Sequence, residues 1–237
     1  MPDGTLSLTT APETSDRRPI AARNTAWAAR ITTVLVRAGL SPNGISVAGM
    51  AFCLLAAAAL AATPLVGPVW ARALFLAAAV LIQLRLLANM FDGMVAIESG
   101  RLSPLGELYN DVPDRVSDAT TLIGLGYATG GWPAMGYLAA VLAVLTAYVR
   151  AVGKAAGAGS DFRGPMAKQQ RMFLATVTGV YMAAAPGAWR PAWGPEYRWG
   201  LPAAALAVIA AGSAWTSARR IRGVAMRLRE PHRSNNP

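Results

Sequence analysis

The chain has 237 residues, of which 54% are hydrophobic and 14% are charged, and this composition excludes an ordinary soluble domain. The formal net charge of +10 is compatible with nucleic-acid binding, but the basic residues lie mostly between apolar segments and in the tails, as in membrane proteins. A single cysteine, Cys53, and a single histidine, His232, exclude a disulfide framework and a thiolate metal cluster, and nearly exclude a histidine-based zinc site.

The N-terminal region predicts a polar tail followed by a surface helix. Residues 1–18 are polar and Thr-rich, lack a signal-peptide pattern, and are predicted to be disordered. Residues 19–40 predict an amphipathic helix on the cytoplasmic membrane surface, with an apolar side made of Trp27, Ile31, Val34 and Leu35. A basic stripe with a spacing of seven residues borders that side: Arg23, Arg30 and Arg37. A solvated basic face on an ordinary helix is the alternative.

Six apolar segments follow, and each predicts a transmembrane helix: 43–63, 68–91, 103–129, 132–152, 166–185 and 200–217. The predicted fold class is an all-α integral membrane protein, with a membrane domain over 19–217 and a basic cytoplasmic tail over 218–237. Basic residues gather at one end of these helices and tryptophans at the other: Trp70, Trp132, Trp189, Trp193 and Trp199. The positive-inside rule then places both termini and the acidic residues described next at the cytoplasmic side.

Carboxylates and amides interrupt the second and third of these apolar segments. Four of them fall within roughly one quadrant of the third helix: Asn110, Asp111, Asp114 and Asp118. Asn89 and Asp92 lie three residues apart on the second helix, where Gly93 and Ala96 leave the same side nearly bare. Facing carboxylates in a membrane are costly unless a positive charge lies between them. The pattern predicts a divalent-cation site of oxygen ligands, suited to Mg²⁺, Mn²⁺ or Ca²⁺, beside a smooth surface for a ligand.

This constellation resembles the signature of the CDP-alcohol phosphotransferases (CDP-alcohol phosphatidyltransferases), Asp-x-x-Asp-Gly-x-x-Ala-Arg followed by Gly-x-x-x-Asp-x-x-x-Asp. The positions that match are Asp92, Gly93, Ala96, Gly106 and Asp114. The segment Ser41-Pro42-Asn43 is similar to the family's Thr-Pro-Asn, and the resemblance extends from Arg23 to the end of the sixth helix. The chain departs from the family at Asn89, Asn110 and Ile97, and its pattern is similar to a bacterial branch in which Asn replaces Asp.

The resemblance implies transfer of a substituted phosphate, expected to be phosphatidyl, from a CDP-linked lipid donor to an alcohol hydroxyl, with release of CMP. Asp114 is then the expected catalytic base. The expected ligands of one or two Mg²⁺ or Mn²⁺ ions are Asn89, Asp92, Asn110 and Asp114, supplemented by Asp111 or Asp118. The expected nucleotide-binding residues are Asp92, Gly93, Ala96 and Gly106. The resemblance also implies phospholipid or polar-lipid synthesis, a homodimer and a bacterial inner-membrane location.

A basic segment at the start of the fifth predicted helix is similar to the family's Gly/Lys/Arg segment. Lys168 and Arg171 lie three residues apart near a helix N-terminus, and Arg163 precedes them, so all three are predicted to bind phosphate of donor or acceptor. The alternative is anchoring by the positive-inside rule. Arg85, one turn before Asn89, is predicted to pair with the acidic cluster.

Two other functions are compatible with these residues. The Asn substitutions suit a catalytically degenerate relative that binds a CDP-lipid or acts as a scaffold. A cation or proton transporter would also use buried acids, although the chain has no obvious inverted repeat. Metal-dependent CMP release distinguishes the enzyme from the other two.

Overall fold

The computed structural model of the chain describes residues 25–101, 104–195 and 198–229. Within these ranges the protein is mostly α-helical, with two short 3-10 turns and one two-stranded hairpin. The helices are α1 (Ala26–Arg37), α2 (Pro42–Ala62), α3 (Pro68–Glu98), α4 (Pro104–Tyr127), α5 (Pro133–Ala155), α6 (Lys168–Ala184) and α7 (Leu201–Arg229). The remaining elements are η3 (Thr63–Leu65), η4 (Gly187–Trp189), β1 (Ala192–Trp193) and β2 (Trp199–Gly200).

Proline marks the beginning of four of the seven helices. Each of these prolines occupies the first helical position, where its missing N–H costs no hydrogen bond. At α2 the Ser41 side chain also accepts a hydrogen bond from Gly44 N at 3.1 Å, which caps the helix. The motif Ser41-Pro42-Asn43 therefore has a local structural function as the start of α2.

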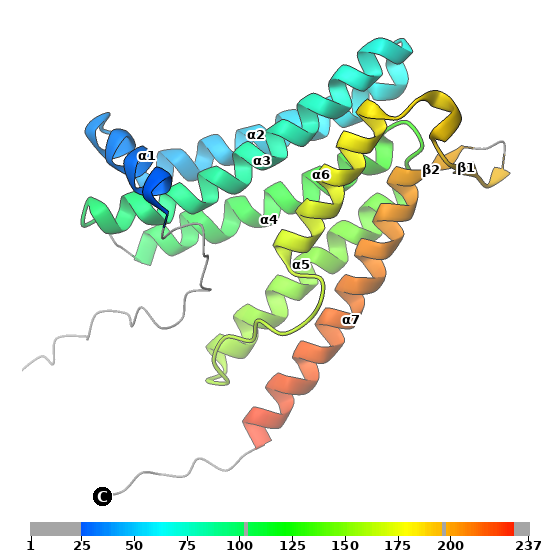
Figure 1. The fold of residues 1–237 in the computed structure, drawn as a ribbon. Coiled ribbons are helices and arrows are strands. Elements are labelled where there is room, and N and C mark those ends of the chain that lie inside the picture. Colours follow the sequence, from blue (N-terminus) through cyan, green and yellow to red (C-terminus); the bar gives the residue numbers. More distant parts are fainter. Residues whose placement is uncertain (1–24, 102–103, 196–197, 230–237) are drawn as a thin grey trace, which may run out of the picture.

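Helices α2 to α4 and helices α5 to α7 form two groups that meet near the hairpin and diverge toward the opposite end (Figure 1). α2 packs on α3 and α4, α4 packs on α5, and α5 packs on α7, while α6 lies mainly against α3. α1 lies across the far end of α3, where Trp27 makes an edge-to-face contact with Phe91. This arrangement brings the C-terminal half of α3, the N-terminal half of α4 and the start of α6 to the same end of the bundle.

Four helices are long and apolar enough to cross a membrane among the residues that the structure describes: Pro42–Leu65, Pro68–Glu98, Pro133–Ala155 and Leu201–Arg229. α4 and α6 coincide with the third and fifth predicted segments, but α4 carries the acids and α6 has only 17 residues. The outer surface of the bundle is rich in exposed aliphatic side chains, as lipid contact requires. Six spans therefore remain a prediction, whereas an all-helical membrane protein agrees with the structure.

Several predicted boundaries differ from the structure, and α3 ends at Glu98 rather than near residue 91. The last helix, expected to end near residue 217, continues to Arg229, because Leu, Met and Arg residues after Ser217 sustain helix formation. The first predicted helix, over 19–40, is observed as α1 (Ala26–Arg37). Residues 1–24 lie outside the described residues. α1 packs through Ala28 and Thr32, so Trp27, Ile31 and Val34 remain exposed. Those three side chains are free to contact lipid.

Candidate active site

Polar side chains converge inside the bundle at the end where α3 finishes and α4 and α6 begin. α3 contributes Arg85, Asn89 and Asp92 on successive turns. α4 contributes Asn110, Asp111, Asp114 and Asp118, as their helical spacing predicted. α6 contributes Lys168 and Arg171 from its first turn. The structure thus brings residues from three predicted helices into one site.

Asp92 is buried between α2 and α3, with 5% of the residue exposed. Its Oδ2 accepts a hydrogen bond from Ser46 Oγ at 2.6 Å, and its Oδ1 accepts one from Gly93 N at 2.6 Å. The sequence prediction missed Ser46, although an isolated hydroxyl in an otherwise apolar helix was an available signal. Ser46 and the Gly93 amide orient this carboxylate on the face that carries Asn89.

Asp114 is the centre of the charged network. Its Oδ1 accepts hydrogen bonds from Arg85 Nη2 and from Lys168 Nζ, the latter at 2.6 Å. Arg85 also donates from Nε to Ser117 Oγ at 3.2 Å. The predicted pairing of Arg85 with the acidic cluster is confirmed. Two cations thus neutralise a carboxylate that would otherwise be buried at a high free-energy cost.

The two asparagines of the site lie in direct contact. With the Asn89 amide oriented to suit its neighbours, its nitrogen donates to Asn110 Oδ1 at 2.8 Å and to Asp114 Oδ1 at 3.0 Å. Its oxygen then accepts from Lys168 Nζ at 3.1 Å. Asn89, Asn110, Asp114 and Lys168 therefore form one hydrogen-bonded group across α3, α4 and α6.

Asp118 and Arg171 form a second, deeper ion pair. Arg171 Nη2 donates to Asp118 Oδ2 at 2.6 Å, and each side chain is 2% exposed. Arg171 Nη1 also donates to Thr146 Oγ1 at 3.2 Å and to the carbonyl of Met166 at 2.9 Å. Thr146 was a further residue that the sequence did not single out. This pair links α4 to the start of α6 one turn below Asp114.

Asp111 and Arg163 lie toward the outside of the site. The Asp111 side chain is 44% exposed. Its Oδ1 accepts from Arg115 Nη2 at 3.3 Å and from Arg150 Nη2 at 3.5 Å. Arg163 donates from Nη2 to Asp161 Oδ2 at 2.6 Å in the loop between α5 and α6. The Arg163 guanidinium holds the pKa of Asp161 below its ordinary value. Arg163 is therefore engaged by a carboxylate of its own loop.

Gly93 and Ala96 lie half-buried on α3 beyond Asp92, and Gly106 lies in the first turns of α4. The three small residues thus flank the charged network at the ends of the two helices. Gly93 directly follows Asp92 in the sequence. Their placement is compatible with a ligand that approaches the helix backbone.

No protein-family model matches the chain. An archaetidylinositol phosphate synthase from Aeropyrum pernix is 34% identical over 104 residues, which cover 44% of this chain and 53% of that relative. The chain therefore spans about half the length of the curated relative that it matches.

Crystal structures of a phosphatidylinositol phosphate synthase from Mycobacterium tuberculosis share the fold. The structure in complex with manganese and citrate has a TM-score of 0.65 at 21% identity, over 83% of this chain and 88% of that chain. The structure with CDP-DAG bound has a TM-score of 0.64 at 21% identity, over 82% of this chain and 92% of that chain. The chain is therefore similar in part of its sequence to an archaetidylinositol phosphate synthase, and it shares the fold of a phosphatidylinositol phosphate synthase.

The oxygen donors of this candidate site suit a hard divalent cation. Among the described residues, no three His, Cys, Asp or Glu side chains gather as a metal cluster. Amide oxygens can complete the set when the Asn89 amide turns its oxygen instead of its nitrogen toward Asn110 and Asp114, and Asp92 follows one turn along α3. Carboxylate and amide oxygens are ordinary ligands of Mg²⁺ and Mn²⁺, so the residues fit the metal that the resemblance implies.

Proposed function

We propose that this protein is a membrane phosphotransferase that moves a phosphatidyl group from a CDP-linked lipid to an alcohol hydroxyl and releases CMP. The observation that carries this proposal is the polar group of Asn89, Asn110, Asp114 and Lys168 where α3, α4 and α6 meet. Asp114 matches the family signature, Asn89 and Asn110 stand at two of its acidic positions, and the chain has the fold of phosphatidylinositol phosphate synthases. A partly buried group of two amides and an ion pair is expected at a site for charged substrates rather than in plain packing.

The proposed metal ligands are Asn89, Asp92, Asn110 and Asp114, with Asp111 as a supplement from the exposed side. A divalent ion bound there would shield the diphosphate of the donor and stabilise the charge on the departing CMP. Asp114 is proposed to accept the proton of the acceptor hydroxyl, because it is the carboxylate in contact with both α3 and α6. Gly93, Ala96 and Gly106 are proposed to contact the nucleotide.

Lys168 is the proposed phosphate-binding cation. Its side chain is 16% exposed and starts at the first residue of α6, so its ammonium can turn from Asp114 to a bound phosphate. Arg171 and Asp118 already bond to each other, so a phosphate or metal contact there requires their pair to open. Arg163 requires release from Asp161 for the same role.

The membrane arrangement is part of the proposal. Residues 19–217 would form a membrane domain of six spans, in which α4 and α6 cross the bilayer beside the four more apolar helices. α1 would lie on the cytoplasmic surface, with Trp27, Ile31 and Val34 in the lipid interface. A homodimer in the bacterial inner membrane, with both termini cytoplasmic, is the proposed state.

The test is CMP release by the purified protein in nanodiscs with CDP-diacylglycerol, Mn²⁺ or Mg²⁺ and a panel of alcohols. Both named relatives join an inositol phosphate to a phosphate-linked lipid, so inositol phosphate is the first acceptor to test. CMP release should require the metal and one acceptor. It should fall by about 100-fold or more in Asp114→Asn, which removes the base but keeps the shape of the side chain.

The second candidate function is binding of a CDP-lipid without turnover. Its motivation is the replacement of two signature acids by Asn89 and Asn110, each of which removes one negative charge from the site. CDP-lipid binding without CMP from any acceptor would establish this alternative and reject the enzyme. Restoring Asn89→Asp and Asn110→Asp would then be expected to produce turnover.

A further inference from the structure

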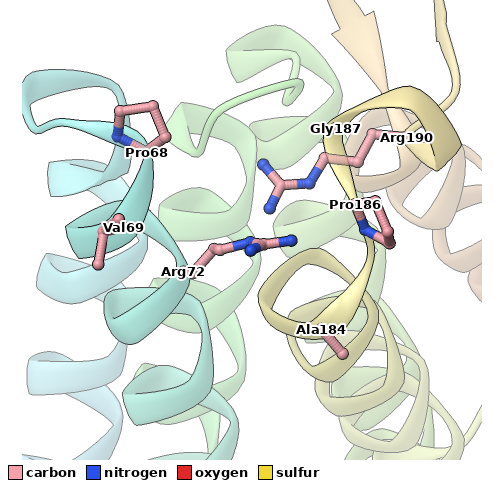
Figure 2. A pocket seen from close by; sticks show the side chains of 7 residues that line it. All are labelled: Pro68, Val69, Arg72, Ala184, Pro186, Gly187 and Arg190. Carbon is pink, nitrogen blue, oxygen red and sulfur yellow. The ribbon is translucent and has the colours of Figure 1, made fainter.

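A second polar site lies at the opposite end of α3 from the candidate active site. A cavity of about 540 Å³ opens between the start of α3 and the segment that follows α6, and Arg72 and Arg190 line it (Figure 2). Val69, Ala184 and Pro186 form apolar parts of its wall. Arg72 precedes Asp92 by 20 residues, or roughly 30 Å along the helix axis, so the two sites are separate.

The two guanidinium groups enter this cavity from opposite walls, Arg72 from α3 and Arg190 from the loop after η4 (Figure 2). Arg72 Nη2 donates to the carbonyl of Ala185 at 2.6 Å, and Arg190 Nη2 donates to the carbonyl of Met182 at 2.7 Å. Arg190 Nε is buried and has no hydrogen-bond partner. Burial, followed by the charge of Arg72, lowers the pKa of Arg190.

Helix capping alone leaves this pair of arginines short of negative charge. The carbonyl end of α6 supplies a partial charge of about −0.5, against two full positive charges. Among the described residues, no carboxylate forms an ion pair with Arg72 or Arg190. Two like charges beside an unpartnered buried N–H therefore favour binding of an anion between them.

The surroundings indicate what carries that anion. Val69 is 77% exposed, Trp70 is 70% exposed and Trp189 is 71% exposed, and all three lie at the end of the bundle that holds this cavity. Exposed tryptophans are enriched at the level of lipid headgroups. Guanidinium groups bind phosphate through two parallel hydrogen bonds, and the apolar wall suits the glycerol and first methylenes of a lipid.

We propose that Arg72 and Arg190 bind the phosphate of a phospholipid headgroup, in the leaflet opposite the candidate active site. The bound lipid would join the start of α3 to the end of α6 and the hairpin loop. This site is independent of the proposed transferase activity, because none of its residues contacts Asp92, Asp114 or Lys168.

Native mass spectrometry of the full chain in a neutral detergent tests the proposal, with phosphatidylglycerol and dioleoylglycerol as matched probes. The wild-type protein should retain phosphatidylglycerol but not dioleoylglycerol, which has acyl chains without a phosphate. In Arg72→Gln/Arg190→Gln the apparent dissociation constant for phosphatidylglycerol should rise about tenfold or more, as the loss of charged hydrogen bonds predicts.

Arg198→Gln is the matched control, because Arg198 is an exposed arginine near the same end that does not line the cavity. Arg198→Gln should bind phosphatidylglycerol like wild type. CMP release should also be unchanged in it, which separates this test from that of the transferase.

Three outcomes would overturn the proposal. Equal retention of the two lipids by wild type would exclude phosphate recognition, even if the double variant did not fold. Equal loss in Arg198→Gln would indicate a diffuse basic surface. Retention of inorganic phosphate without phosphatidylglycerol would assign the cavity to a free anion instead of a lipid.

Discussion

At the scale of single residues, charge neutralisation explains most of the buried polar contacts. Asp114 faces two cations, Asp118 faces one, and Asp92 is held by neutral donors from Ser46 and Gly93. Asp92 is therefore the buried carboxylate of the site without an ion-pair partner among the described residues. This difference makes Asp92 the carboxylate most available to a metal, and Asp114 the one that must exchange partners when substrates bind.

Breaking the Asp118–Arg171 pair should markedly lower the free energy of unfolding. Asp118→Asn or Arg171→Met alone leaves an uncompensated buried charge or donor, and each should destabilise the protein by about 3–5 kcal/mol. The double variant Asp118→Leu/Arg171→Met should recover much of this loss, because it removes both charges. Thermal unfolding in detergent measures the cycle. Additive losses in the double variant would show that the two residues do not act as a pair.

At the scale of elements, small residues set how closely the helices approach. A Cβ added at Gly124 of α4 would lie 2.6 Å from Ala57 Cα and 2.8 Å from Ala57 O of α2. A Cβ added at Gly49 of α2 would lie 2.7 Å from Arg85 Nη1. The α2–α4 contact at Gly124 is thus backbone against backbone, whereas the α2–α3 contact at Gly49 is against the side chains of Arg85 and Ala88.

Gly124→Ala should destabilise the bundle by about 1–3 kcal/mol, because the backbone of α2 cannot move aside as a side chain can. Gly67→Ala is the matched control, since nothing lies within 4 Å of its added Cβ and its φ is −65°. Unfolding temperatures of the two variants in one detergent provide the comparison. Similar values for both would contradict close α2–α4 packing.

The loop between α5 and α6 is tied to α7 by a pH-sensitive contact. Asp161 pairs with Arg163 and lies 3.7 Å from Arg227 Nη2, and its folded pKa is lowered. A lowered carboxyl pKa stabilises the fold above the ordinary value of 3.8, and this contribution is lost as the pH falls through the folded value. The stability difference between wild type and Asp161→Asn should therefore shrink between about pH 5 and about pH 2. A constant difference over that range would contradict the ion pair.

At the scale of the whole molecule, the two ends of the bundle differ in chemistry. One end holds the carboxylates, Lys168 and α1, and the other holds the Arg72–Arg190 cavity and exposed tryptophans. Arginines are also numerous along the last turns of α7, near the end that holds the carboxylates. This asymmetry is what a membrane protein needs to adopt a single orientation.

Cysteine labelling in cells can test that orientation. Leu65 is 81% exposed in η3, between α2 and α3, and Leu228 is 50% exposed in the last turn of α7, while the native Cys53 is fully buried. The α2–α3 connection and the end of α7 lie at opposite ends of the molecule (Figure 1). Leu65→Cys should react with a membrane-impermeant maleimide in intact cells, and Leu228→Cys only after permeabilisation. The wild type gives the background. The reverse pattern would place the termini outside the cytoplasm.

The sequence by itself determined the helices and which helix carries each predicted polar residue, because apolar length, proline positions and helical spacing are local properties. It placed Asn110, Asp114 and Asp118 on one side of α4 and predicted the pairing of Arg85. Only the tertiary structure decided the partners: Lys168 reaches Asp114, Arg171 is buried against Asp118, and Arg163 turns to Asp161. Arg163 and Asp161 belong to the same loop, but whether Arg163 contacts Asp161 or a bound phosphate depends on how that loop packs against α7. Which side chains pair between helices depends on the packing of segments that are far apart in the chain. The periodicity of a single sequence does not report that packing.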